Sequence, residues 1–106
     1  DAMVGDSGIA MTEMKVDGGI TANQLCMQMQ ADVMGIEIVK PLITETTALG
    51  AAYAAGLAIG FWKSTDEVKA QWRQDQRWKP QSDAKTREIG AAQWKRAVAR
   101  TFNWLD

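Results

Sequence analysis

Hydrophobic and polar residues alternate at one point near the start of the chain and then follow a helical period. Residues 14–16 alternate as in a short β-strand, and residues 21–34 repeat apolar side chains at the spacing of an α-helix. The apolar stripe of this helix consists of Ala22, Leu25, Cys26, Met29 and Val33. Residues 36–39 then predict a second strand, which Pro41 ends. The pattern therefore predicts a strand-helix-strand unit over residues 14–40.

This unit favours parallel pairing of its two strands. Gly35 is well placed as the residue just past the end of the helix, and the connection is long enough for a crossover. In an open α/β sheet, ligands bind beyond the carboxyl ends of the strands, where Gly18 and Gly19 lie. A sheet of two strands is too small to be stable alone, and the pattern indicates no further strand.

Small residues dominate the next stretch and predict an Ala-rich helix over residues 45–61. Its alanines and glycines favour burial by close packing against another element. The uncharged run 46–62 could also be interpreted as a membrane-spanning helix, but it is short and contains few strongly hydrophobic residues. We therefore expect a packed helix and no membrane segment.

The remainder, residues 64–106, is predicted to be a helical tail. Ser64 and Glu67 form a capping-box pattern that begins a short helix ending near Trp72. Residues 74–82 are polar and predict a loop, after which Ser82 could cap a helix over 83–104. The apolar line of that last helix consists of Ala91, Trp94, Val98, Phe102 and Leu105.

Composition narrows the possible chemistry. The chain has 106 residues, enough for one small domain, with a single cysteine and no histidine. Histidine-based catalysis and histidine-ligated metals are thus excluded within it, and nothing suggests an oxidising compartment. No signal peptide is visible in the sequence, and we expect a cytoplasmic location.

Charge is uneven although the net charge is only −1. Lys15 and Lys40 are the only basic residues before Lys63, and all five tryptophans lie at or after position 62. Basic residues among aromatics can bind nucleic acid, but tryptophans packed on a core under a solvated basic face explain the pattern equally simply. Because acidic residues in the tail offset much of its positive charge, we expect no nucleic-acid partner.

The stretch Val16–Asn23 combines a strand end, two glycines and the start of a helix. Free N–H groups at a helix start favour anionic ligands, and glycine lets a ligand approach the main chain, although such a stretch is also typical of a plain tight turn. The other candidate residues are interpreted as structural: Asp17 and Asp32 as solvated or capping acids with no nearby partner for a carboxylate pair, Glu45 at a helix start, and Cys26 in the core. Residues 56–64 lack the spacing and preceding strand of a phosphate-binding loop.

Several segments together closely resemble the C-terminal part of the glycerol kinases, within the FGGY carbohydrate kinases. The matching segments are Val16–Asn23, Leu25–Gly35, Val39–Pro41 and Glu45–Trp62, with a looser match at Pro80–Gln81 and Trp94–Val98. The resemblance implies an α/β fragment of an actin-like ATPase (ribonuclease H-like) domain with short parallel strands and a helical C-terminal tail. It also implies ATP-dependent phosphorylation of glycerol to glycerol 3-phosphate, with Mg²⁺.

The resemblance further assigns roles to individual residues. Gly19 and Asn23 match family positions that contact the nucleotide near its adenosine end, and Gly18 serves the turn; these three are the expected cofactor-binding residues. The family's catalytic, polyol-binding and metal-holding residues match nothing here, so we expect no catalytic and no metal-binding residue in this chain. Residues 1–106 would form the C-terminal portion of the second, nucleotide-side domain of a longer kinase.

The partners expected from the resemblance are glycerol, ATP, the remainder of the kinase and a second copy in a homo-oligomer. Two other interpretations stay open at this point. The chain could belong to another FGGY polyol or sugar kinase, or it could be a non-catalytic binding module that uses its Trp-rich basic tail.

Overall fold

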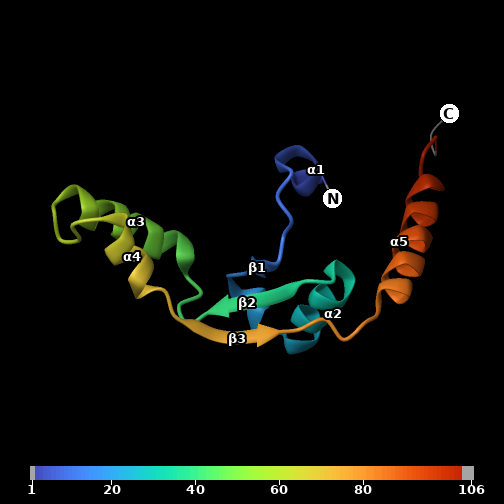
Figure 1. Ribbon diagram of the computed structural model, residues 1–106, viewed down its shortest axis with the longest axis horizontal. Helices are drawn as coiled ribbons and strands as arrows, with labels where there is room; N and C mark the ends of the chain where they lie inside the picture. Colours follow the sequence, from blue (N-terminus) through green and yellow to red (C-terminus); the bar gives the residue numbers. More distant parts are fainter. Residues whose placement is uncertain (1, 104–106) are drawn as a thin grey trace.

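The computed structural model describes residues 2–103, which form short helices around a small sheet (Figure 1). In chain order the elements are α1 (Ala2–Ser7), β1 (Glu13–Lys15), the 3₁₀ helix η1 (Gly19–Ala22), α2 (Gln24–Met34), β2 (Glu37–Pro41), α3 (Thr46–Ala58), α4 (Thr65–Gln71), β3 (Gln74–Trp78) and α5 (Ala84–Ala99). The fold is of the mixed α/β class.

The sheet has three strands in the order β1-β2-β3. β1 pairs with β2 in parallel, with Met14 opposite Ile38. Helix α2 connects the two strands, as the predicted strand-helix-strand unit requires. β3 pairs with β2 in the antiparallel sense, with Trp78 opposite Ile38, and the register shifts between Lys40 and Pro41. Pro41 is thus the last residue of β2, and the central strand is paired on both sides.

The prediction of a loop over residues 74–82 is wrong, because its first half forms β3. This segment contains a single apolar residue, Trp78, so the hydrophobic pattern gives no strand signal. Charged contacts hold it against its neighbours: Lys40 Nζ lies 2.8 Å from an Asp75 carboxylate oxygen, and Arg77 forms an ion pair with Glu37. β3 also supplies the third strand that seemed to be missing and makes the sheet mixed rather than purely parallel.

Helix α2 covers one face of the sheet and forms the small core. Met27 and Ala31 of α2 are fully buried against Ile38 of β2 and Trp78 of β3. Successive side chains of a strand point to opposite faces, so Val39 is buried on the other face. That face carries the guanidinium of Arg77, which lies opposite Val39 in the register.

The predicted apolar stripe of α2 is not its buried face. Leu25, Met29 and Val33 are 70%, 57% and 76% exposed, and Ala22 lies in η1, ahead of the helix. Apolar side chains surround most of α2, so their period alone could not select the side that meets the sheet. Cys26 is half-buried and packs at the edge of the core, close to the structural role expected for it.

Helix α3 is shorter and far more exposed than predicted. It covers Thr46–Ala58 rather than residues 45–61, and Gly56 is its one buried residue. The Trp62 ring occupies the space that a Cβ at position 56 would need, and it also meets Tyr53 edge-on at 5.0 Å between centroids. Burial is confined to this contact because the other described elements leave the remaining faces of α3 uncovered. Among residues 2–103, no helix is long and apolar enough to cross a membrane.

The caps of α4 and α5 only partly follow the prediction. Ser64 caps α4 by accepting the Glu67 N–H, and the Glu67 carboxylate accepts the Lys63 N–H at 2.7 Å. Asp83, not Ser82, caps α5 by accepting the Thr86 N–H at 2.7 Å. The helix ends at Ala99 instead of residue 104; Leu105, which was placed on its apolar line, lies outside the described residues.

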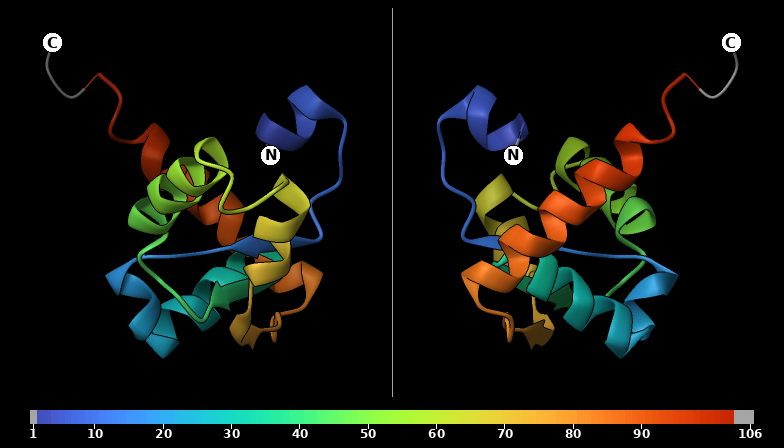
Figure 2. Two further views of the ribbon diagram at one scale, coloured as in Figure 1. Left: turned by 90° about the vertical axis from the view of Figure 1, so that its left-hand side faces the viewer. Right: turned by 90° about the vertical axis from the view of Figure 1, so that its right-hand side faces the viewer.

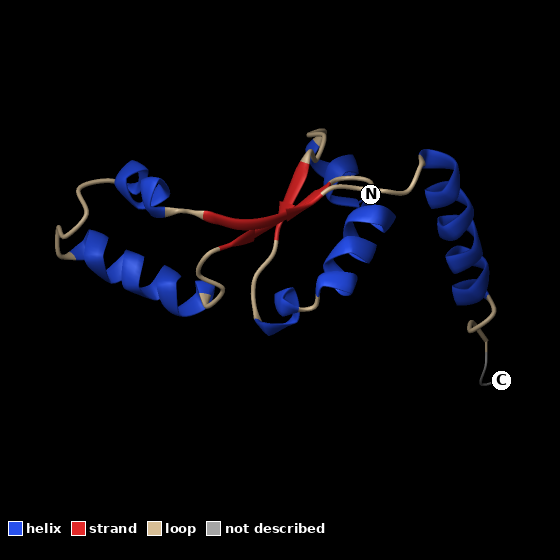
Figure 3. Cartoon of the chain, turned by 90° about the horizontal axis from the view of Figure 1, so that it is seen from below, coloured by secondary structure: helices blue, strands red, loops and turns tan. Residues whose placement is uncertain are grey.

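The described part of the chain is elongated. Its radius of gyration is 18.4 Å and its extents are 57 × 37 × 30 Å, whereas a compact chain of this length would have a radius of gyration of about 13 Å. Helices α3 and α4 lie at one end and α5 at the other, with the strands between them (Figure 3). Views along the long axis from both ends show the first helix, α1, standing away from the sheet (Figure 2).

Candidate functional site

The candidate site lies at the carboxyl ends of the parallel strands β1 and β2, and these two ends together form one edge of the sheet. Because the two strands are parallel, the segments that follow them emerge side by side. The Val16 N–H donates to the Val39 carbonyl at 3.0 Å, and the Gly18 N–H donates to the Thr44 carbonyl at 3.1 Å. These bonds join the glycine turn after β1 to the segment that leads from β2 into α3.

Gly18 adopts a backbone conformation that glycine alone tolerates well. Its φ is 81° and its ψ is 175°, outside the regions open to L-residues with a Cβ. The Gly18 carbonyl accepts hydrogen bonds from the Thr21 N–H at 3.1 Å and from Thr21 Oγ1 at 2.6 Å. Thr21 is 1% exposed, so this double contact fixes the turn from its inner side.

Gly19 presents an open main chain. It is exposed, its φ is not positive, and a Cβ placed there would meet no described atom within 4 Å. The same space is open beside Gly18. A ligand can therefore approach the main chain at Gly18 and Gly19 without competing with side chains.

Asn23 begins α2 as its N-cap residue. Its side-chain Oδ1 accepts the Cys26 N–H at 3.0 Å, which satisfies one of the free donors at the helix start. The acceptor half of the carboxamide is thus committed to the helix, while the Nδ2 group can donate to a ligand. The sequence predicted Asn23 in the first turn of a continuous helix over residues 21–34; instead, η1 covers residues 19–22 and α2 begins at Gln24.

Asp17 has a partner that the sequence did not predict. Its carboxylate accepts a hydrogen bond from Thr46 Oγ1 in the first turn of α3. The two residues are far apart in the chain and meet only because β1 and β2 end at one edge. Thr21, Thr44 and Thr46 are the members of this site that sequence reasoning missed. The parallel pairing of the two strands was the signal that could have indicated the last two.

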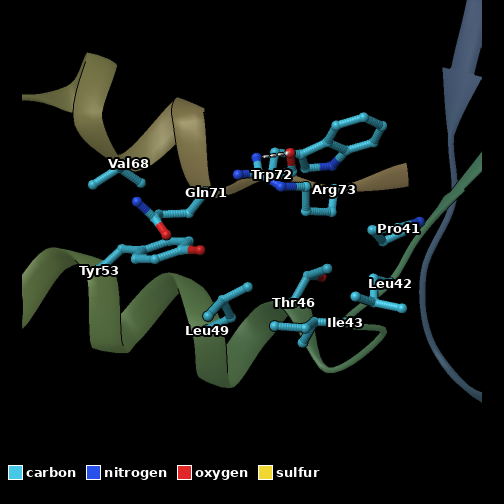
Figure 4. A pocket seen from close by; sticks show the side chains of 10 residues that line it. All are labelled: Pro41, Leu42, Ile43, Thr46, Leu49, Tyr53, Val68, Gln71, Trp72 and Arg73. Atoms are coloured by element: carbon cyan, nitrogen blue, oxygen red, sulfur yellow. Dashed lines mark hydrogen bonds between the residues drawn. The ribbon is translucent and has the colours of Figure 1, made fainter. Parts of the chain in front are cut away.

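A pocket of about 210 Å³ lies beside this edge, between α3 and α4 (Figure 4). The aromatic rings of Tyr53 and Trp72 line it, and Thr46 forms part of its wall on the side of the Asp17 contact. The Arg73 guanidinium bonds to the Trp72 carbonyl at 3.0 Å. The lining is mostly apolar and contains no carboxylate, cysteine or histidine, so it offers mainly packing contacts.

The perturbed titratable groups of the described residues serve structural contacts. The Gln81 N–H lowers the pKa of Asp32, helped by bonds from Gln28 and Ser82, and the Thr86 N–H lowers the pKa of Asp83. The Glu37 carboxylate raises the pKa of Arg77. Asp32 accepts backbone N–H groups, which is compatible with the capping role suggested for it, and it anchors the segment before α5.

The described residues 2–103 include no candidate metal site. These residues contain no group of three or more His, Cys, Asp or Glu side chains able to hold a metal ion. What they do present is a set of exposed main-chain groups and one carboxamide, from Gly18 through Asn23. Such a surface can bind and orient a ligand.

Comparison with known proteins gives this geometry a context. The model of the C-terminal domain of the FGGY family of carbohydrate kinases matches residues 1–59. A glycerol kinase from Mycolicibacterium gilvum is 58% identical over all 106 residues, and one from Mycobacterium tuberculosis H37Rv is 56% identical over the same length. The chain covers 21% and 20% of these two proteins, so it spans about a fifth of their length.

Solved structures share the fold. The crystal structure of Plasmodium falciparum glycerol kinase with ADP superposes with a TM-score of 0.83 and 36% sequence identity, over 97% of this chain and 21% of that protein. The xylulose kinase from Lactobacillus acidophilus gives a TM-score of 0.67 at 18% identity, over 86% of this chain and 19% of the other. The expected fold class, a fragment of an actin-like ATPase domain, is confirmed.

Proposed function

Because the chain belongs to the FGGY family of carbohydrate kinases, we propose that it forms one wall of the nucleotide site of a glycerol kinase. The activity, ATP-dependent phosphorylation of glycerol to glycerol 3-phosphate, would belong to a longer protein, since relatives named glycerol kinase are about five times the length of this chain. Residues 1–106 would form the C-terminal portion of its second, nucleotide-side domain.

One observation carries this proposal: the open glycine turn and the Asn23 cap lie together at the carboxyl edge of a parallel strand pair. In α/β sheets this edge is where ligands bind. The residues fit the adenosine end of a nucleotide, which is flat and carries several hydrogen-bonding atoms. Gly19 would let the ligand rest against the main chain, and Asn23 Nδ2 would donate to it.

The remaining steps of the reaction would fall to residues outside this chain. ATP would supply the phosphoryl group, and Mg²⁺ would supply positive charge to stabilise its transfer. The described residues include no cluster that could hold that ion, so we propose that the metal, the catalytic base and the glycerol pocket come from the rest of the kinase. This chain would position the nucleotide and would not be active alone.

Replacement of Asn23 tests the proposal. In the full-length protein, Asn23→Ala removes both the Nδ2 donor and the helix cap, so the KM for ATP should rise about fivefold or more, as expected for the loss of one hydrogen bond. The KM for glycerol should stay within about twofold of the wild-type value. Steady-state kinetics with each substrate varied in turn give both constants.

Asn23→Ser is the matched control. Serine keeps an oxygen that can cap α2 but has no carboxamide to reach the nucleotide. It should therefore restore the stability lost in Asn23→Ala without restoring the KM for ATP. If Asn23→Ser has the wild-type KM for ATP, the residue acts only as a helix cap and its assignment to the nucleotide fails.

The arrangement of tryptophans does not favour the binding-module alternative. Trp78 is buried in the core, where its Nε1 donates to Gln24, and Trp62 packs on α3. Trp72 lies under the ammonium of Lys15 at 4.3 Å. These rings serve separate contacts and do not gather into one basic aromatic surface. Trp104 lies outside the described residues.

A further inference from the structure

The glycine turn and helix α3 are joined by two hydrogen bonds that come from adjacent residues. The Gly18 N–H donates to the Thr44 carbonyl at 3.1 Å, and the Asp17 carboxylate accepts from Thr46 Oγ1. Thr44 and Thr46 flank the start of α3. The two bonds start from adjacent residues of the turn and end on residues close together at the start of α3. They therefore restrain the turn against rotation as well as translation, which one bond could not do.

Asp17 also supplies what the start of α3 lacks. Glu45 occupies the N-cap position of α3, but its side chain forms no capping hydrogen bond. A carboxylate beside the first turn of a helix is stabilised by the free N–H groups and by the helix dipole. Asp17 therefore has an electrostatic reason to stay at this position, in addition to its bond with Thr46.

We propose that Asp17 is a positioning residue for the nucleotide: through Thr46 it holds the turn that carries Gly19 and Asn23 in fixed register with α3. This inference rests on the proposed function, because it concerns the same site. Asp17 acts through the turn, and neither it nor Thr46 is assigned a contact with the ligand. If the pair is separated, Gly19 and Asn23 keep their identities but lose their fixed placement.

The activity test uses the isosteric variant Thr46→Val in the full-length protein. Valine keeps the shape of threonine in the wall of the pocket between α3 and α4 but cannot donate to Asp17. The KM for ATP should rise about fivefold, the amount expected for one lost hydrogen bond, while the KM for glycerol and kcat change by less than about twofold. Thr46→Ser, which keeps the hydroxyl, should restore the KM for ATP.

Two further variants identify the pair as the cause. Thr47→Val makes the same chemical change one residue further along α3, at an exposed position, and should leave every constant unchanged. The double variant Asp17→Ala/Thr46→Val should raise the KM for ATP no further than Asp17→Ala alone, since both changes break one contact. Additive effects would show that the two residues act separately and would overturn the proposal.

Amide hydrogen exchange of the full-length protein, without nucleotide, gives a second readout that does not depend on activity. Thr46→Val should speed exchange at the Gly18 amide, which is bonded to the Thr44 carbonyl, and at the Thr21 amide, which is bonded within the turn, more than at amides of α2. Unchanged exchange at these amides overturns the role of Asp17, as does an equal rise in both KM values. If the wild-type protein fails to phosphorylate glycerol with ATP, the proposed function fails, and the exchange result alone decides the positioning role.

Discussion

Gly18 and Gly19 are adjacent, yet the fold requires glycine only at position 18. Gly18 has φ of 81° and ψ of 175°, which an L-residue reaches only with strain, while a Cβ there would meet no described atom within 4 Å. Gly19 has no positive φ and faces open space. The first glycine is needed by the fold, and under the proposed function the second is needed by the ligand.

Alanine substitution separates these two needs. Gly18→Ala should lower the free energy of unfolding by about 1–3 kcal/mol, the usual cost of forcing a side chain into this backbone region. Gly19→Ala should change stability by less than about 0.5 kcal/mol but raise the KM for ATP about tenfold, because its methyl group occupies the approach to the main chain. Thermal unfolding and steady-state kinetics of the full-length protein measure both effects.

The reverse assignment would contradict this account. If Gly19→Ala binds ATP normally, the open main chain at this position is not part of the nucleotide contact. If Gly18→Ala keeps full stability, its positive φ carries no strain. Each outcome is decided in one variant without reference to the other.

The sequence predicted the part of the site that is local. Gly18, Gly19 and Asn23 lie within one short stretch, where a strand end followed by glycines and a helix start indicated a ligand-binding turn, and the family resemblance assigned the three residues their predicted roles. Thr46 lies on a different element, and nothing in its own neighbourhood indicates Asp17 as its partner. Such a contact follows only from the pairing of β1 with β2 and from where the two strands end.

At the scale of elements, α5 is held mainly at its N-terminal end. The Asp32 carboxylate accepts the Gln81 N–H at 2.5 Å and the Ser82 N–H at 3.3 Å, and Ser82 Oγ donates to the Asp32 carbonyl at 2.6 Å. Beyond this anchor the helix extends away from the sheet, as Figure 1 shows. The sequence predicted Ser82 to be a helix cap. Its contact with Asp32 joins segments that are far apart in the chain, and such a contact leaves no local sequence pattern.

Acid should weaken this anchor. The Gln81 N–H and the other donors lower the pKa of Asp32 below its ordinary value of 3.8, so the charged carboxylate stabilises the attached state. That stabilisation is present above pH 3.8 and is lost as the pH falls through the lowered pKa of the folded state. The amide proton shifts of Gln81 and Ser82, followed by NMR, should therefore titrate with a midpoint below pH 3.8.

The titration has an internal control. The pKa of Asp83 is lowered by the Thr86 N–H, so the Thr86 amide reports on the helix cap and not on the anchor. Asp32→Asn should abolish the acid transition at Gln81 and Ser82 while leaving that at Thr86. A midpoint at or above pH 3.8 for the Gln81 amide would show that the bonds to Asp32 do not favour its charged form.

Helix α2 and strand β3 show where hydrophobic patterning succeeds and fails for this chain. The existence of α2 and its end at Gly35, which has a left-handed φ of 69°, followed from period and cap chemistry. The buried side of α2 did not, because it depends on Ile38 and Trp78 across the sheet. β3 was missed because polar and charged side chains, with Arg77 and Asp75 in ion pairs, hold it at the edge of the sheet.

At the scale of the whole molecule, the described chain exposes the apolar surface of a part rather than of a complete domain. The outer face of α2 carries Leu25, Met29 and Val33, and a groove between α2 and α5 continues that face from Val33 to Trp94. Contiguous exposed apolar faces are normally covered by another part of a protein or by a partner. We expect the remainder of the proposed kinase to cover these faces, and a homo-oligomer stays a prediction.

The contact between the nucleotide and the turn from Gly18 to Asn23 is the central element of the proposed function. The most direct measurement is a crystal structure of the full-length protein with a non-hydrolysable ATP analogue. The account predicts that the adenosine lies against the main chain at Gly19, with Asn23 Nδ2 within hydrogen-bonding distance. An adenosine bound elsewhere, with the Gly18–Asn23 turn facing solvent or buried away from the ligand, would contradict it.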